Sequence, residues 1–161
     1  NRWLKPATGN VKMNVDGGVS RNGARGAAAV ICRDEAGAFL GASAIVFDGL
    51  VDPPSLEAQA CNEALALAKD LNLRRVQVAL DCIEVVNNIN KGGAPVYGLV
   101  MHEIKDRMED LEFVNFSFEF RESNFEAHAL VKAATSLAVG RHVWLGIMPD
   151  IICIPHLLSS V

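Results

Sequence analysis

The sequence has few of the features that hold small secreted scaffolds together. Its four cysteines, Cys32, Cys61, Cys82 and Cys153, lie far apart, and none of them forms a C-x-x-C pair. This spacing argues against a zinc site and against a disulfide framework. We therefore expect reduced thiols that behave as small buried hydrophobic groups, in an intracellular protein of the nucleus or the cytoplasm.

Long apolar runs are also missing. No stretch reaches the roughly 18 consecutive apolar residues from which a membrane-spanning helix is recognised. Residues 1–10 lack the charged-then-apolar layout of a secretory signal. We therefore expect no membrane partner.

An excess of basic residues is absent as well. The chain has 15 Lys and Arg residues against 19 Asp and Glu residues, which gives a net charge of −4. Domains that grip nucleic acid strongly through its phosphates are usually basic, so this balance argues against tight autonomous binding. It leaves room for an enzyme whose bound metal ions offset part of the acidic charge.

The chain does contain enough apolar residues for one folded domain. Half of its 161 residues are hydrophobic, which suffices for a substantial core. Alternation of apolar and polar residues predicts strands, and apolar residues at helical spacing predict helices. The predicted strands cover 11–15, 27–32, 38–47, 76–80 and 113–120, and the predicted helices cover 53–71, a short stretch after 81, 99–111 and a stretch that follows 124.

The ends of these elements carry recognisable signals. Asp52 or Ser55 is the expected capping residue of the helix that begins at Pro53, and Ser123 or Asn124 is the expected cap of the last helix.

We predict an α/β fold with a mixed five-stranded sheet and the order β-β-β-α-β-α-α-β-α. Residues 1–140 form the predicted domain, and the apolar but irregular residues 141–161 are a tail that packs on the domain or meets a partner.

Three carboxylates should meet at one edge of this sheet. Crossover connections make the later strands parallel to each other and to the first strand. Asp16 and Asp81 then lie at neighbouring carboxyl ends, and Glu57 lies in the first turn of the helix that returns to the fourth strand. This edge is where ligands bind in such sheets.

A cluster of three acids needs cations, because the carboxylates repel each other. Oxygen ligands without a histidine or cysteine cluster suit Mg²⁺ or Mn²⁺. Two such ions about 3.5–4 Å apart can position a water for in-line attack on a phosphodiester. Each acid alone also has a structural explanation: Asp16 as a turn former, Asp81 with Glu84 as a capping box, and Glu57 as a partner of the helix dipole.

At this point the sequence resembles type 1 ribonuclease H, and more closely the reverse-transcriptase-like ribonuclease H domains that are abundant in plants and derive from retroelements. The matching segments run in order along nearly the whole chain. They are Trp3-Leu4-Lys5-Pro6, Lys12-Met13-Asn14-Val15-Asp16-Gly17-Gly18, Val30-Ile31-Cys32-Arg33-Asp34, Ser55-Leu56-Glu57-Ala58, Val78-Ala79-Leu80-Asp81-Cys82, Arg121-Glu122-Ser123-Asn124, Ala127-His128-Ala129-Leu130 and Val143-Trp144-Leu145.

The resemblance implies a ribonuclease H-like fold, two divalent metal ions and cleavage of the RNA strand of RNA/DNA hybrids. Asp16, Glu57 and Asp81 fall on the first three acids of the family's four-acid site. The fourth position holds His128, which is familiar in the plant group but brings no negative charge. Glu126 is no substitute, because two residues on a helix differ in direction by about 160° at 3.6 residues per turn.

These observations give a set of candidate site residues. Asp16, Glu57 and Asp81 are the expected metal ligands, and His128 is either an auxiliary catalytic residue or a half-exposed structural histidine. Gly17, Asn22, Arg25 and Ser55 are the expected substrate-binding residues, since donors in the turn after Asp16 could reach a phosphate or a 2′-hydroxyl. A solvated turn is the alternative for Asn22 and Arg25.

Three interpretations of function stay open. The first is a metal-dependent endonuclease that hydrolyses RNA in RNA/DNA hybrids, with activity reduced by the change to His128. The second is a weakened or inactive module of the same fold that binds nucleic acid or, through its apolar tail, a protein partner or a second copy. The third is an exonuclease or strand transferase, since folds do not fix function.

Overall fold

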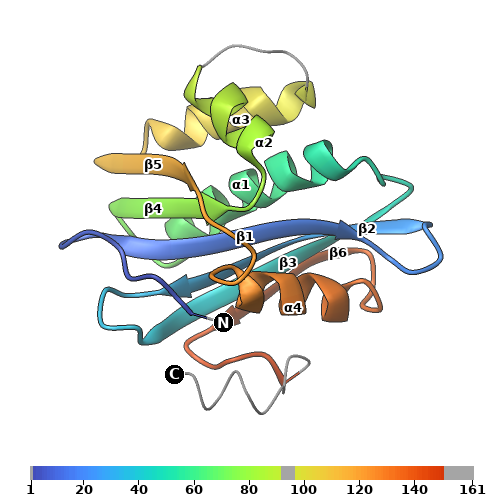
Figure 1. Ribbon diagram of the computed structural model, residues 1–161, viewed down its shortest axis with the longest axis horizontal. Coiled ribbons are helices and arrows are strands. Elements are labelled where there is room, and N and C mark those ends of the chain that lie inside the picture. Colours follow the sequence, from blue (N-terminus) through green and yellow to red (C-terminus); the bar gives the residue numbers. More distant parts are fainter. Residues whose placement is uncertain (1, 92–96, 151–161) are drawn as a thin grey trace.

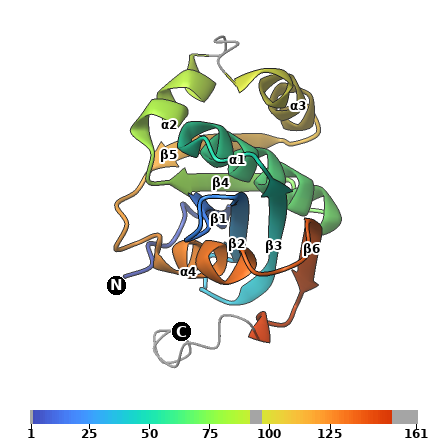
Figure 2. The ribbon, with the colours of Figure 1, turned by 90° about the vertical axis from the view of Figure 1, so that its right-hand side faces the viewer.

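The computed structural model describes residues 2–91 and 97–150 and has one mixed sheet between two layers of helices (Figures 1 and 2). The ten elements run in the order β-β-β-α-β-α-α-β-α-β. They are β1 (Val11–Val19), β2 (Arg25–Arg33), β3 (Phe39–Asp48), α1 (Pro53–Asp70), β4 (Arg75–Leu80), α2 (Ile83–Asn90), α3 (Leu99–Met108), β5 (Phe113–Phe118), α4 (Phe125–Ala134) and β6 (Gly140–Leu145).

The sheet has the order β5-β4-β1-β2-β3-β6. β1, β2 and β3 form an antiparallel meander, and β4 and β5 continue the sheet parallel to β1. This arrangement confirms the predicted α/β fold and its parallel crossovers. The sheet nevertheless contains six strands, so the expected count of five is wrong.

The extra strand, β6, comes from the start of the segment interpreted above as an apolar tail. β6 pairs antiparallel with β3, from Gly41 opposite Leu145 to Val46 opposite Gly140. Its side chains alternate between half-buried and exposed, because β6 is an edge strand that meets the helices poorly. Six alternating residues in an otherwise irregular apolar stretch gave too little periodicity to identify it. Residues 151–161 of the predicted tail, with Cys153, lie outside the described residues.

Both faces of the sheet are covered, and β2 shows this most directly. Ala28, Val30 and Cys32 pack into a core with α1, whereas Ala27 and Ile31 pack into a second core with α4. Figure 2 shows α1, α2 and α3 on one side of the sheet and α4 on the other. Because β2 is buried on both faces, its sequence is a continuous apolar run rather than an alternating one.

The first helix begins as its sequence predicts. Asp52 is the N-cap of α1, and its carboxylate accepts hydrogen bonds from the Ser55 backbone N–H at 3.2 Å and the Ser55 hydroxyl at 2.5 Å. Pro53 and Pro54 occupy the first turn, where no backbone donor is needed. This cap fixes where α1 starts, and with it the position of Glu57 at the edge of the sheet.

Cys32, Cys61 and Cys82 are free thiols, the first two of them buried. In the described part of the chain, no helix is both long enough and apolar enough to span a membrane.

Candidate metal site

The three predicted acids meet at one edge of the sheet. Asp16 lies in β1, Glu57 is the fifth residue of α1, and Asp81 directly follows β4. Each offers a carboxylate oxygen, and these three oxygens lie within 4.8 Å of one another. The β1–β4 pairing places Asn14 opposite Ala79. Continuing this register by two residues brings Asp16 opposite Asp81.

A close approach of β1 to α1 completes the cluster. A side chain on Gly17 would place its Cβ 2.6 Å from the carbonyl carbon of Leu56 and 2.8 Å from the backbone nitrogen of Glu57. Only glycine fits at that distance, because the contact is to backbone that cannot move aside. Gly17 therefore brings Glu57 to Asp16, which gives this predicted substrate-binding residue a structural role.

Burial makes the cluster costly in the absence of a cation. Asp16 is 1% exposed and Glu57 is 7% exposed. Burial, reinforced by the negative charge of Asp16, raises the pKa of Glu57 to about 10. Burial and the charge of Asp81 likewise raise the pKa of Asp16. Removing charged carboxylates from water and placing them side by side disfavours their ionisation, and a cation between them reverses both effects.

The residues present fit a divalent metal ion. Glu57 Oε2 is buried and accepts no hydrogen bond from the described residues. An acceptor left unsatisfied in the protein interior costs free energy unless something else occupies it. Three oxygen ligands without cysteine suit Mg²⁺ or Mn²⁺. Asp16, Glu57 and Asp81 are thus the residues that would hold the ion.

His128 approaches the cluster from α4, which packs on the face of the sheet opposite to α1 (Figure 2). Its Nδ1 atom lies 2.9 Å from Asp16 Oδ2, and its side chain is 30% exposed. The sequence located His128 at the site edge through the family pattern. Its contact with Asp16 depends on the way α4 packs against β1.

Arg121 is the site residue that the sequence analysis missed. Its Nε atom donates to Asp81 Oδ2 at 2.7 Å, and its Nη1 atom lies 3.2 Å from His128 Nε2. Arg121 belongs to a segment that matches the family, and this match is the signal in the sequence that could have identified it as a site residue. No periodicity or spacing rule indicated that a residue after β5 reaches across to Asp81.

Glu126 faces away from the cluster, as the helical geometry predicted. Its side chain is buried, and both of its carboxylate oxygens accept hydrogen bonds from Arg33 of β2, at 2.8 and 2.6 Å. This bidentate ion pair ties α4 to β2. Glu126 therefore contributes to the placement of the helix that carries His128.

A buried polar network fixes the start of α4. Lys12 of β1 pairs with Glu119, and Asn14 donates to Glu119 Oε1 at 3.2 Å and to Asn124 Oδ1 at 3.1 Å. The Asn124 amide in turn donates to the Val15 carbonyl at 2.7 Å. Asn124 is the N-cap residue of α4, but its side chain bonds to β1 instead of capping the helix. The network anchors α4 one residue away from Asp16.

The remaining predicted residues make hydrogen bonds that shape the turn after β1 and the start of α1. Asn22 Oδ1 accepts hydrogen bonds from Ser20 and Ala24 and so shapes the turn. Arg25 donates to the carbonyls of Thr135 and Leu137 at 3.3 and 2.8 Å. Ser55 belongs to the cap of α1, as described above. These contacts do not test substrate binding.

A cavity of about 740 Å³ opens next to this turn. Its lining combines cationic and hydrogen-bonding side chains and contains no carboxylate: Val19, Ser20, Arg21, Asn22, Arg25, Lys132, Thr135 and Ser136. The cavity adjoins the carboxyl end of β1 at Val19, three residues beyond Asp16. Its chemistry suits a phosphate backbone.

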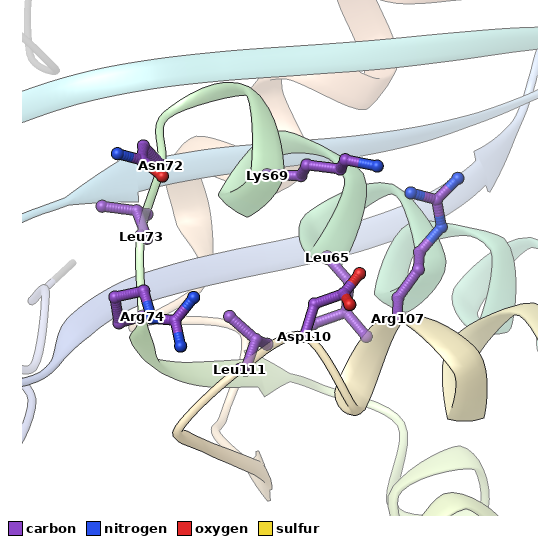
Figure 3. Close-up of a pocket in the computed structure, with 8 residues that line it drawn as sticks. All are labelled: Leu65, Lys69, Asn72, Leu73, Arg74, Arg107, Asp110 and Leu111. Carbon is purple, nitrogen blue, oxygen red and sulfur yellow. The ribbon is translucent and has the colours of Figure 1, made fainter.

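A second pocket, of about 300 Å³, lies at the opposite end of α1 (Figure 3). It is lined by Leu65, Lys69, Asn72, Leu73, Arg74, Arg107, Asp110 and Leu111. The carboxyl ends of α1 and α3 both lie at this pocket. Lys69 in the last turn of α1 and Arg107 in the last turn of α3 compensate the partial negative charge of these helix ends. Leu65, the lining residue of α1 nearest to Glu57 in sequence, is more than two helical turns away from it, so this pocket does not belong to the candidate metal site.

Comparisons with known proteins agree with this geometry. A family model described as "Reverse transcriptase-like" matches residues 14–134, a span that includes all three acids, Arg121 and His128. No curated protein matches the sequence.

Solved structures of similar fold include several ribonucleases H. Ribonuclease H1 from Halobacterium salinarum NRC-1 superposes with a TM-score of 0.70 at 15% identity, over 79% of this chain and 97% of that one. The N-terminal ribonuclease H domain of Rv2228c from Mycobacterium tuberculosis gives 0.70 at 18% identity, over 78% and 93%. LC11-RNase H1 in complex with RNA/DNA hybrid gives 0.67 at 23% identity, over 76% and 94%. At these identities the likeness establishes the fold.

Proposed function

Because the chain belongs to the reverse transcriptase-like family of ribonuclease H-like domains, we propose that it is a metal-dependent endonuclease that hydrolyses the RNA strand of RNA/DNA hybrids. The observation that carries the proposal is the convergence of Asp16, Glu57 and Asp81 within 4.8 Å. The structure of LC11-RNase H1, a structural relative, in complex with an RNA/DNA hybrid supports the choice of substrate.

The proposed mechanism rests on the three acids. Asp16, Glu57 and Asp81 would hold the divalent ions, and Asp16 also contacts His128. Two bound divalent ions supply an activated water and stabilise the leaving oxygen of an in-line displacement. Burial of Asp16 and Glu57 keeps bulk water away from the ligands and strengthens their electrostatic interactions.

His128 would hold and orient Asp16 rather than replace a missing carboxylate. It brings no negative charge, so the second ion would be held less tightly than in a four-acid site. We therefore propose activity that is weaker than that of four-acid relatives. The cavity beside Asn22 and Arg25 would take the backbone of the hybrid, which would lie across the carboxyl edge of the sheet.

Cleavage of a labelled RNA/DNA hybrid tests the proposal. Wild type and Asp16→Asn would be compared with Mg²⁺, with Mn²⁺ and with EDTA, and duplex DNA and single strands would serve as control substrates. We expect RNA-strand cleavage that requires metal and whose rate falls by more than about 100-fold in Asp16→Asn. Even the loss of a residue that only orients a metal ligand lowers activity by about 10- to 100-fold. Cleavage that survives in Asp16→Asn would refute the assignment.

A second candidate function is an inactive module of the same fold that binds nucleic acid. The replacement of the fourth acid by His128, which is engaged with Asp16, favours it. The same experiment separates the two candidates. Retention of the hybrid by folded protein without any cut, in either metal, would support the binding module.

A further inference from the structure

Arg121 pairs with one of the three acids at the candidate metal site. Its Nε atom donates to Asp81 Oδ2 at 2.7 Å, and it is the one arginine that contacts any of the three acids within the described residues. Its side chain is 59% exposed, whereas that of Asp81 is 10% exposed. The guanidinium therefore covers a largely buried carboxylate from the solvent side and has room to leave it.

The guanidinium also reaches Asp16 through His128. Arg121 Nη1 lies 3.2 Å from His128 Nε2, and His128 Nδ1 lies 2.9 Å from Asp16 Oδ2. A guanidinium has only donors, so Nε2 must accept. The imidazole is then neutral, with its proton on Nδ1, from which it donates to Asp16. One positive charge thus connects Asp81 to Asp16 by three hydrogen bonds.

From this arrangement we propose that Arg121 is a tethered counter-ion of the metal-free site, and that divalent ions displace it from Asp81. The inference rests on the metal binding that the proposed function requires, and it adds a residue that sets the metal affinity of the site. In the metal-free protein, Arg121 offsets part of the repulsion among the three carboxylates. In the metal-loaded protein, the same positive charge opposes the bound cations.

Both consequences act on metal binding in the same direction. Replacing Arg121 with a neutral residue destabilises the metal-free protein and removes repulsion from the metal-loaded protein. Each change tightens metal binding. A residue that simply oriented Asp81 for coordination would have the opposite effect, because its loss would weaken binding. The sign of the change therefore identifies the role.

Calorimetric titration with Mg²⁺ and with Mn²⁺ tests the proposal without measuring activity. The proteins are wild type, Arg121→Gln, Arg121→Lys and Arg74→Gln. Arg74 is exposed at the remote pocket, so Arg74→Gln loses the same charge far from the acids. We expect Arg121→Gln to bind metal about two- to fivefold more tightly, as an ion pair of this exposure allows. Arg74→Gln should match wild type, and Arg121→Lys should lie between wild type and Arg121→Gln.

The melting temperature and the His128 ring provide independent readouts. Without metal, Arg121→Gln should melt at a lower temperature than Arg74→Gln, and added Mg²⁺ should raise its melting temperature more than that of wild type. In ¹⁵N spectra of metal-free wild type, His128 should appear as the Nδ1–H tautomer. Saturating Mg²⁺ should shift the Arg121 Nε resonance as the pair with Asp81 opens.

Each outcome decides between the proposals. Equal or weaker metal binding by Arg121→Gln, with wild type binding normally, would overturn the counter-ion role and leave the proposed function standing. Failure of wild type to bind either metal would overturn both the counter-ion role of Arg121 and the proposed function. Tighter binding by Arg74→Gln to the same extent would reduce the effect to net charge and would overturn the role of Arg121.

Discussion

The buried acids of this protein fall into two groups that differ in their partners. Glu119 and Glu126 pair with the buried cations Lys12 and Arg33, and Glu63 pairs with the half-buried Arg141. Glu57, by contrast, lies beside two other acids, and its Oε2 atom has no partner among the described residues. Acids that hold the fold are thus compensated by buried or partly buried cations of the protein. At the candidate site, within the described part of the chain, Asp81 has only the exposed Arg121, and Glu57 is left for a cation from outside.

Breaking a compensated pair should have the largest effect on stability. Arg33→Leu leaves Glu126 buried without its bidentate partner, and such a loss costs about 3–5 kcal/mol of unfolding free energy. Chemical denaturation measures the change. The double variant Arg33→Leu with Glu126→Leu is the control, and it should recover most of the loss. If the single variant were as stable as wild type, the pair would not anchor α4.

Separating the site acids requires a change at their point of contact. Gly17→Ala forces β1 away from the backbone of Leu56 and Glu57, and overpacking of this kind costs about 1–3 kcal/mol. Gly18→Ala is the matched control, since its Cβ would meet only the Cγ1 atom of Val131. We expect Gly17→Ala to be the less stable of the two and to bind Mn²⁺ more weakly. Equal effects from both variants would contradict the packing argument.

Removing an uncompensated acid should stabilise the metal-free protein, which is the opposite of the Arg33 effect. Because its pKa is raised to about 10, Glu57 has to take up a proton on folding near neutral pH, which costs free energy. Glu57→Gln does not incur this cost, and we expect a gain of about 1 kcal/mol near neutral pH. Denaturation with EDTA measures the gain, and the same variant should bind Mg²⁺ more weakly. A loss of stability in EDTA would show that Glu57 is structural.

The pH dependence of stability follows from the same acids. The pKa of Glu57 is raised to about 10 from 4.5, so the folded state retains a proton that the unfolded state releases above pH 4.5. The stability of the metal-free protein should therefore fall as pH rises from about 5 towards 10. Glu57→Gln should flatten this slope, and saturating Mg²⁺ should oppose it. A rise in stability with pH would contradict the shift.

The smallest effect should come from a compensated pair that solvent reaches. Arg141 donates to Glu63 at 2.8 Å and to Asp70 at 2.6 Å, but a third of its side chain is exposed. Arg141→Gln should cost less than about 1 kcal/mol, because solvent screens the pair and glutamine can still donate to Glu63. Thermal melts of this variant beside Arg33→Leu would rank the two pairs. A cost as large as that of Arg33→Leu would remove the distinction between them.

The sequence by itself determined nine of the ten described elements and the meeting of the three acids at the candidate site. Alternation and helical spacing located five strands and four helices, and strand order brought Asp16, Glu57 and Asp81 to one edge. These features depend on local periodicity and on chain connectivity, both of which can be read along the chain. The direction of Glu126 away from the site followed in the same way from helical geometry.

Only the tertiary structure decided the features that depend on contacts between distant segments. β6 became visible through its pairing with β3, because an edge strand carries weak periodicity. Gly17 acquired its role from the approach of α1, and Arg121 from its reach to Asp81. Which acid has a partner depends on packing between elements far apart in sequence, and no local pattern encodes it.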